Sequence, residues 1–133
     1  MHRVVIDTNV VVSSNIVASG NPTEIMKRFY LGELQLFYSG RILDEYIKVL
    51  AYKRLNISAA TQTAVIAAIK AGGIFIEPPI STISMPDESD RPFYDVATAS
   101  GAILITGNTK DYPKEPFIML PADFLLKIAN KTK

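Results

Sequence analysis

The sequence contains no cysteine and only one histidine, His2. Disulfide bonds and thiolate metal sites are therefore excluded, and a metal ion would have to be held mainly by oxygen ligands. Oxygen ligands favour magnesium or manganese over zinc.

Long hydrophobic runs and charge of one sign are also missing. The apolar segments are short and interrupted, and residues 1–10 lack the features of a secretion signal, so we expect a soluble, cytoplasmic protein with no membrane partner. The 14 basic and 13 acidic residues leave a formal charge of +1. This balance neither requires nor excludes nucleic acid as a partner.

The 133 residues, of which 48% are hydrophobic, are enough for one core, and we expect one domain over residues 1–133. Short apolar runs alternate with helical patterns, which is typical of β-α units around a largely parallel sheet. Strands are predicted over residues 3–6, 34–39, 74–79, 102–106 and 117–120. Helices are predicted over residues 22–31, 40–55, 59–71 and 91–100, and from Pro121 onward.

Polar residues follow three of these predicted strands. They are Asp7-Thr8-Asn9 after the first strand, Ser39 after the second, and Thr106-Gly107-Asn108 after the fourth. In an open α/β sheet, ligands bind in the crevice outside the carboxyl ends of the strands. We therefore expect these polar residues to share one site.

Asp7 interrupts the apolar run "VVIDTNVVVSS" (residues 4–14). An ionised carboxylate at the edge of a core is unfavourable unless it is paired or binds a cation. The alternative is that Asp7 caps a helix or forms a turn. Asn9 is either a turn residue or a hydrogen-bonding partner that holds the shape of the site.

Glu45 differs from its neighbour Asp44 in its position on the predicted helix. The predicted buried face consists of Ile42, Leu43, Tyr46, Ile47 and Leu50. Glu45 lies at the margin of this face, whereas Asp44 points away from it. Glu45 is the candidate site residue, and the alternative is an ordinary exposed glutamate.

The densest acidic region contains Asp87, Glu88, Asp90 and Asp95. Asp90 precedes Arg91-Pro92 and is a typical helix N-cap, yet it could also face the same crevice as Asp7. Asp95 lies more than about 100° further around the helix, so it is at most a supporting group.

Three or four carboxylates at one site would repel one another and raise their pKa values. One or two divalent cations would remove this conflict. Paired cations could also stabilise the attacking and leaving oxygens in phosphodiester cleavage.

Three stretches, in order and spacing, resemble the PIN-domain ribonucleases and most closely the VapC-like toxins of toxin–antitoxin pairs. They are "VVIDTNVVVSS", "SGRILDEYIKVL" and "DESDRPFYDVATASGAILITGN", and the resemblance covers residues 3–120. It implies a three-layer α/β/α sandwich with a mostly parallel sheet, Mg²⁺ or Mn²⁺ as cofactor, and cleavage of single-stranded RNA. It also leads us to expect an antitoxin protein as a partner and a homodimer.

Residue by residue, the resemblance implies that Asp7, Glu45 and Asp90 are the catalytic acids and the metal ligands. It implies that Asn9 and Thr106 are the supporting polar residues.

Asn108 departs from the family pattern, because many members have aspartate at this position. An amide adds no negative charge, which leaves the second metal ion in question. Asp95 or Asp111 would then have to supply the missing charge.

Three other functions are weighed against this one. A two-component receiver domain needs an acidic pair after the first strand and an acceptor aspartate after the middle strand, and neither is present. A haloacid-dehalogenase-type phosphatase needs a second acid where this sequence has Asn9. The third is a PIN-fold protein that binds RNA or a partner without cutting it, which Asn108 keeps open.

Overall fold

The structure is a computed structural model that describes residues 1–131. Its centre is a five-stranded sheet in which every neighbouring pair of strands is parallel, in the order β3-β2-β1-β4-β5. The strands are β1 (His2–Ile6), β2 (Leu34–Tyr38), β3 (Ile74–Phe75), β4 (Ile103–Ile105) and β5 (Ile118–Met119).

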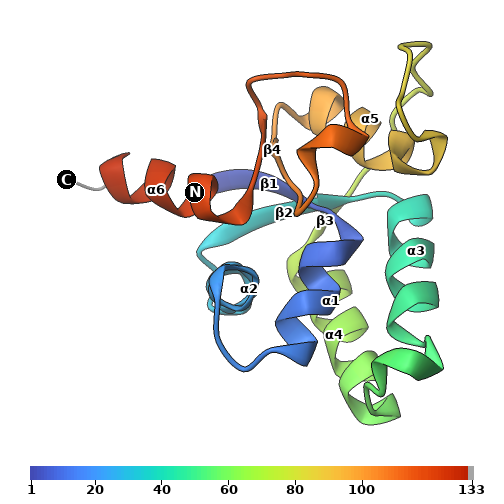
Figure 1. The fold of residues 1–133 in the computed structure, drawn as a ribbon, viewed down its shortest axis with the longest axis vertical. Coiled ribbons are helices and arrows are strands. Elements are labelled where there is room, and N and C mark those ends of the chain that lie inside the picture. Colours follow the sequence, from blue (N-terminus) through green and yellow to red (C-terminus); the bar gives the residue numbers. More distant parts are fainter. Residues whose placement is uncertain (132–133) are drawn as a thin grey trace.

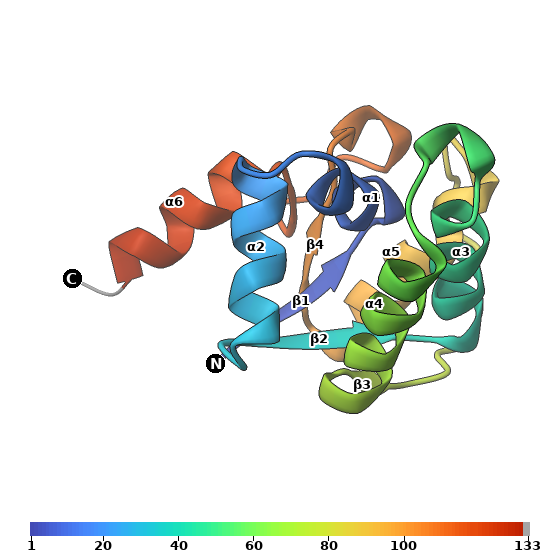
Figure 2. The same ribbon diagram turned by 90° about the horizontal axis from the view of Figure 1, so that it is seen from below.

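Helices cover both faces of this sheet. α5 lies on one face and α1 to α4 on the other, while α6 lies beside α2 (Figures 1 and 2). This arrangement confirms the expected α/β fold with three layers. The helices are α1 (Thr8–Ile16), α2 (Asn21–Tyr30), α3 (Gly40–Leu50), α4 (Ala59–Gly72), α5 (Arg91–Ser100) and α6 (Pro121–Lys131), and short 3-10 helices span Lys53–Leu55, Glu88–Asp90 and Thr109–Asp111.

The order of the strands places a topological switch point beside β1. The chain runs from β1 to β2 and β3 on one side, then crosses the sheet to β4 on the other side. Val4 of β1 is accordingly paired with Leu36 of β2 and with Ile103 of β4. The carboxyl ends of β1 and β4 therefore border the crevice in which ligands bind in open α/β sheets.

The three central strands are buried on both faces, which explains their nearly continuous apolar sequences. A buried tyrosine on α3 fixes the end of β1, because the hydroxyl group of Tyr46 donates a hydrogen bond to the carbonyl oxygen of Ile6. Fully buried side chains in the strands include Val4, Val5, Ile6, Leu36, Leu104 and Ile105.

Two local signals begin and end the helices that border the switch point. The hydroxyl group of Ser39 accepts a hydrogen bond from the backbone N–H of Ile42 at 3.3 Å and so caps the start of α3. Gly101, with φ of +67°, ends α5 in the left-handed conformation that glycine adopts at low cost. The start of α3 is thus fixed at the carboxyl end of β2, and the end of α5 is fixed just before the amino end of β4.

Helix α1 was not predicted. Val10, Val11 and Val12 continue the apolar run after Asp7 and were assigned to no element, but they lie in a helix between α2 and α3 and are all buried. A helix that is buried on most sides lacks the apolar and polar faces that mark a surface helix, and three adjacent β-branched residues resemble a strand.

Other boundaries also differ from the predictions. α3 ends at Leu50 rather than continuing to residue 55, and β3 and β5 are shorter than predicted. Ile47, assigned to the buried face of α3, is 45% exposed. In the described part of the chain, no helix is long and apolar enough to cross a membrane.

Candidate active site

Asp7 lies at the switch point, directly after β1 and at the N-cap position of α1. Its backbone N–H donates to the carbonyl oxygen of Ile105 at 2.9 Å, which extends the pairing of β1 with β4 by one residue. Its side chain is only 6% exposed. One carboxylate oxygen, Oδ2, accepts hydrogen bonds from the hydroxyl groups of Thr106 at 2.8 Å and Tyr112 at 2.9 Å. Asp7 is therefore held by two neutral donors at this oxygen.

Burial raises the pKa of Asp7, while the hydrogen bonds from Thr106 and Tyr112 act in the opposite direction. Burial also raises the pKa of Tyr112, and the negative charges of Asp7 and Asp90 add to the effect. Tyr112 therefore keeps its proton over the physiological pH range and remains a hydrogen-bond donor to Asp7.

Asp90 occupies the N-cap position of α5, but its side chain makes no capping hydrogen bond. Burial raises its pKa to about 7, with further contributions from the negative charges of Asp7, Asp87, Asp111 and Glu45. The carboxylates that act on Asp90 thus come from its own segment and from three other segments of the chain.

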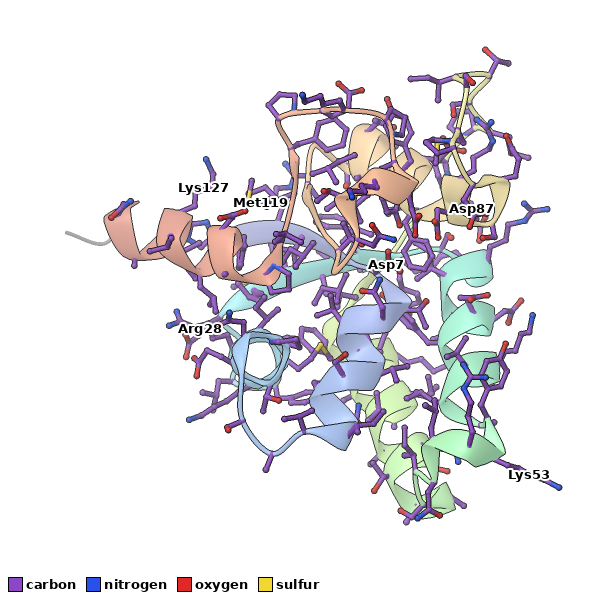
Figure 3. All side chains as sticks on the ribbon, viewed as in Figure 1. Asp7, Arg28, Lys53, Asp87, Met119 and Lys127 are labelled. Atoms are coloured by element: carbon purple, nitrogen blue, oxygen red, sulfur yellow. The ribbon has the colours of Figure 1, made fainter. Side chains whose placement is uncertain are left out.

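We call Asp7, Glu45, Asp90 and Asp111 the carboxylate cluster. Glu45 is half-buried on α3, and Asp111 ends the 3-10 helix that follows β4. No member of the cluster belongs to either of the two ion pairs found among the described residues. Figure 3 shows the labelled basic side chains, Arg28, Lys53 and Lys127, well away from Asp7. The cluster thus has an excess of negative charge that no ion pair of the described chain offsets.

The donor set fits a hard divalent cation, because it consists of carboxylate oxygens and lacks a cationic partner. The side chains do not form a closed coordination shell, since no three acidic or histidine side chains within residues 1–131 stand close enough to hold one ion. An ion at this position would therefore keep water ligands, as magnesium usually does.

A second group of residues fixes the loop after β4. The side-chain oxygen Oδ1 of Asn9 accepts a hydrogen bond from the backbone N–H of Gly107 at 3.0 Å. The backbone N–H of Asn108 donates to the hydroxyl oxygen of Thr106 at 3.1 Å. A β-carbon on Gly107 would lie 3.3 Å from Asn9 Oδ1, so little space separates the two loops. Asn9 thereby helps to hold Thr106 against Asp7.

The structure separates the remaining candidates. Asn108 is exposed beside the cluster, and Asp44 is exposed on α3. Asp95 is buried, and its Oδ2 accepts a hydrogen bond from the backbone N–H of Ser81 at 3.1 Å. The negative charge of Asp111 is among those that raise the pKa of Asp90.

One residue of the site was not identified from the sequence. Tyr112 lies in a turn between Asp111 and Pro113, and no periodicity distinguishes it from a core aromatic residue. Thr8 directly follows Asp7 and belongs to the polar residues that we expected at this edge of the sheet. Its buried hydroxyl oxygen has no hydrogen-bond partner among the described residues.

Comparison with known proteins identifies the class of this fold and site. The sequence model of the PIN domain matches residues 3–110. An uncharacterized protein of Methanocaldococcus jannaschii is 32% identical over 109 residues, which make up 80% of this chain and 70% of that relative.

This chain belongs to the PIN-domain family. Proteins of this family are in general nucleases that depend on divalent metal ions. At this level, the chain is a hydrolase of nucleic acid.

Proposed function

We propose that this protein is an endoribonuclease that cleaves single-stranded RNA with Mg²⁺ or Mn²⁺, and that it is the toxin of a toxin–antitoxin pair. Asp7, Glu45 and Asp90 are the proposed metal ligands and catalytic residues. The observation that carries the proposal is the carboxylate cluster at the switch point, where no ion pair among the described residues offsets the acids.

Each residue has a defined part in this proposal. Asp7 is the central ligand, because hydrogen bonds from Thr106 and Tyr112 fix its carboxylate while burial restricts its movement. Glu45 and Asp90 approach from α3 and α5 and complete the charge of the site. A bound divalent ion would supply the activation of water and the charge stabilisation that phosphodiester cleavage requires.

Asn108 and Asp111 bear on how many ions the site holds. Asn108 contributes no charge, whereas Asp111 carries a carboxylate into the cluster from the same loop. We therefore expect the site to bind one divalent ion tightly and a second ion weakly.

The test is the cleavage of an unstructured RNA that carries different fluorophores at its two ends. We expect internal cleavage with Mg²⁺ or Mn²⁺, products with 5′ phosphates, and no cleavage in excess EDTA. Undiminished cleavage in EDTA would contradict the proposal, because it would show that cleavage does not require the metal ion.

A second candidate is a PIN-fold protein that binds RNA without cutting it. Asn108 and the lack of three converging ligands favour this candidate. Tight RNA binding together with no cleavage under any of Mg²⁺, Mn²⁺ or Co²⁺ would support it over the nuclease.

The toxin proposal and the homodimer have separate tests. Induced expression should arrest growth, and co-expression of a small reading frame adjacent to the gene should relieve the arrest if that frame encodes the antitoxin. Light scattering of the purified protein should give twice the mass of the 14.6 kDa chain. Growth unaffected by expression would remove the toxin role and leave the nuclease intact.

A further inference from the structure

A pocket lies beside the carboxylate cluster, between the start of α3, α5 and the segment that follows β3. Its volume is about 180 Å³, and Ser39, Arg41, Glu77, Arg91 and Asp95 are among the residues that line it. A closed cavity of about 150 Å³ admits a benzene molecule. This open pocket therefore has room for the aromatic ring system of one base.

Hydrogen bonds between separate segments fix the walls of this pocket. The side chain of Glu77 accepts from the backbone N–H of Gly40 at 2.8 Å, which ties the segment after β3 to α3. Ser81 is tied to α5 twice, because its N–H donates to Asp95 and its carbonyl oxygen accepts from Arg91 at 2.8 Å. The pocket is thus formed without a ligand.

Asp95 lacks a partner for one of its two oxygens. The residue is only 5% exposed, and Oδ1 is buried with no hydrogen-bond donor among the described residues. Arg91 lies nearby but does not pair with it, because its guanidinium donates to Glu88, Ser81 and Ile83 instead. A buried, unpaired carboxylate oxygen is costly, which favours a ligand that donates a hydrogen bond to it.

The rim of the pocket carries a positive charge, in contrast to the carboxylate of Asp95 inside it. Arg41 is exposed on the first turn of α3 and makes no hydrogen bond or ion pair with the described residues. A guanidinium in this position suits a phosphate group. The pocket thus combines an acceptor inside with a cation at its opening.

We propose that this pocket binds the base of one nucleotide of the RNA substrate and that Asp95 selects guanine. Guanine presents two adjacent donors, N1–H and the 2-amino group, which match the two oxygens of a carboxylate. Adenine and cytosine offer an amino group without an adjacent ring N–H, and uracil offers a single ring N–H. Proteins commonly read single-stranded RNA through the Watson–Crick edges of unstacked bases.

The pocket lies within reach of the carboxylate cluster. Asp95 follows Asp90 on α5, about 7.5 Å further along the helix axis at about 1.5 Å per residue. Figure 1 shows the segment between β3 and α5, in yellow, beside the first turn of α3. Glu45 lies further along the same helix. The inference rests on the proposed function, since it takes RNA as the ligand and places the guanine near the cleaved bond.

The experiment measures binding in EDTA, so that cleavage plays no part. The probes are fluorescent oligouridines with a single central guanosine, inosine, 1-methylguanosine or 7-deazaguanosine. We expect guanosine and 7-deazaguanosine to bind roughly tenfold more tightly than inosine or 1-methylguanosine, which lack one donor of the edge. Because the change is in the RNA, this arm uses only the wild-type protein.

Two protein variants separate the acceptor from the cation. Asp95→Asn should abolish the preference for guanosine, whereas the matched control Asp44→Asn, which is exposed on α3, should keep it. Arg41→Ala should weaken the binding of all four RNAs by the same factor and reduce its salt dependence. Circular dichroism verifies the fold of each variant.

A further arm titrates the wild type with guanosine 5′-monophosphate and inosine 5′-monophosphate, followed by NMR. Binding of the guanosine nucleotide that Asp95→Asn removes, without any binding of RNA, would keep the pocket as a nucleotide site and refute RNA as its source. RNA binding of equal strength for all four probes would overturn the selection of guanine and leave the nuclease proposal standing. If neither RNA nor nucleotide binds, the pocket proposal fails, while the cleavage assay with Mg²⁺ decides the nuclease proposal separately.

Discussion

Helix α5 carries two aspartates in opposite surroundings. Asp90, at its start, is half-buried, and four other carboxylates act on it. Asp95, five residues on, is more deeply buried, yet it accepts a backbone hydrogen bond and lies near Arg91. Among the described residues, no ion pair offsets the charge around Asp90, whereas Oδ1 of Asp95 lacks a hydrogen-bond donor. The comparison teaches that burial alone does not define a metal site, since the charge of the neighbouring groups decides which ligand is required.

The largest expected effect follows from removing the charge at the centre of the cluster. Asp7→Asn changes the volume of the side chain little, and we expect it to lower the rate of RNA cleavage by at least about 100-fold. Asp44→Asn, which removes an exposed carboxylate from α3, should stay within about twofold of wild type. Initial rates on an unstructured RNA test both variants. Equal losses of cleavage rate in the two variants would mean that the charge of Asp7 matters no more than that of an exposed carboxylate.

Tyr112→Phe tests the hydroxyl groups that hold Asp7. The variant removes one of two hydrogen bonds to a buried carboxylate, so the free energy of unfolding should fall by about 1.5–3 kcal/mol. The control is Tyr52→Phe, because the hydroxyl group of Tyr52 has no hydrogen-bond partner among the described residues. Urea unfolding near pH 7 measures both changes. A loss of the same size in the control would assign the effect to packing rather than to the carboxylate.

Asn108→Asp adds a charge to the loop beside the cluster. We expect half-maximal cleavage at a several-fold lower magnesium concentration than in wild type, because carboxylate count sets much of the affinity of an oxygen site. The double variant that carries both Asn108→Asp and Asp7→Asn should stay inactive. A magnesium titration of the cleavage rate gives the answer, and an unchanged midpoint would indicate that Asp111 already supplies the charge or that one ion is enough.

The smallest expected effect concerns the pH dependence of stability. The pKa of Asp90 is raised to about 7 from an ordinary value of 3.8, so its contribution to stability is present below pH 3.8 and is lost as the pH rises through 7. In EDTA, Asp90→Asn should therefore lose less stability than wild type between pH 5 and about pH 8. Urea unfolding at both pH values measures the difference, and an equal loss would show that Asp90 is not the responsible group.

Magnesium extends this test to the comparison of the two aspartates. At pH 8, added Mg²⁺ should raise the melting temperature of wild type and of Asp95→Asn, but have much less effect on Asp90→Asn. Thermal unfolding with and without the ion is the measurement. An equal response of the two variants would remove the distinction between the two regions.

The sequence predicted the sheet and most helices because their signals are local. The runs around Val4, Leu36 and Leu104 are apolar enough to mark buried strands, and Ser39 and Gly101 mark helix ends. The helix after Asp7 was missed because its valines are buried by α2 and α3, which no local pattern reveals.

The candidate site likewise contains residues that the sequence indicated and contacts that it could not indicate. Asp7, Glu45 and Asp90 were proposed because strand ends and helix phase place them at one edge of the sheet, and their role remains a proposal. The contact of Tyr112 with Asp7 could not be predicted, because it joins residues 105 positions apart through a turn without periodicity. The unpaired oxygen of Asp95 likewise depends on the path of the segment after β3.

The hydrogen bond between Asp7 and Thr106 joins two residues that are 99 positions apart. During synthesis Asp7 is made well before the hydroxyl groups that fix its carboxylate, which are added only after β4. Contacts of such long sequence separation form late in folding, because loop closure opposes them until the strands pair. A chain that is fully made but only partly folded therefore contains every acid of the cluster without the contacts that fix Asp7, and we expect it to be inactive until β1 and β4 have paired.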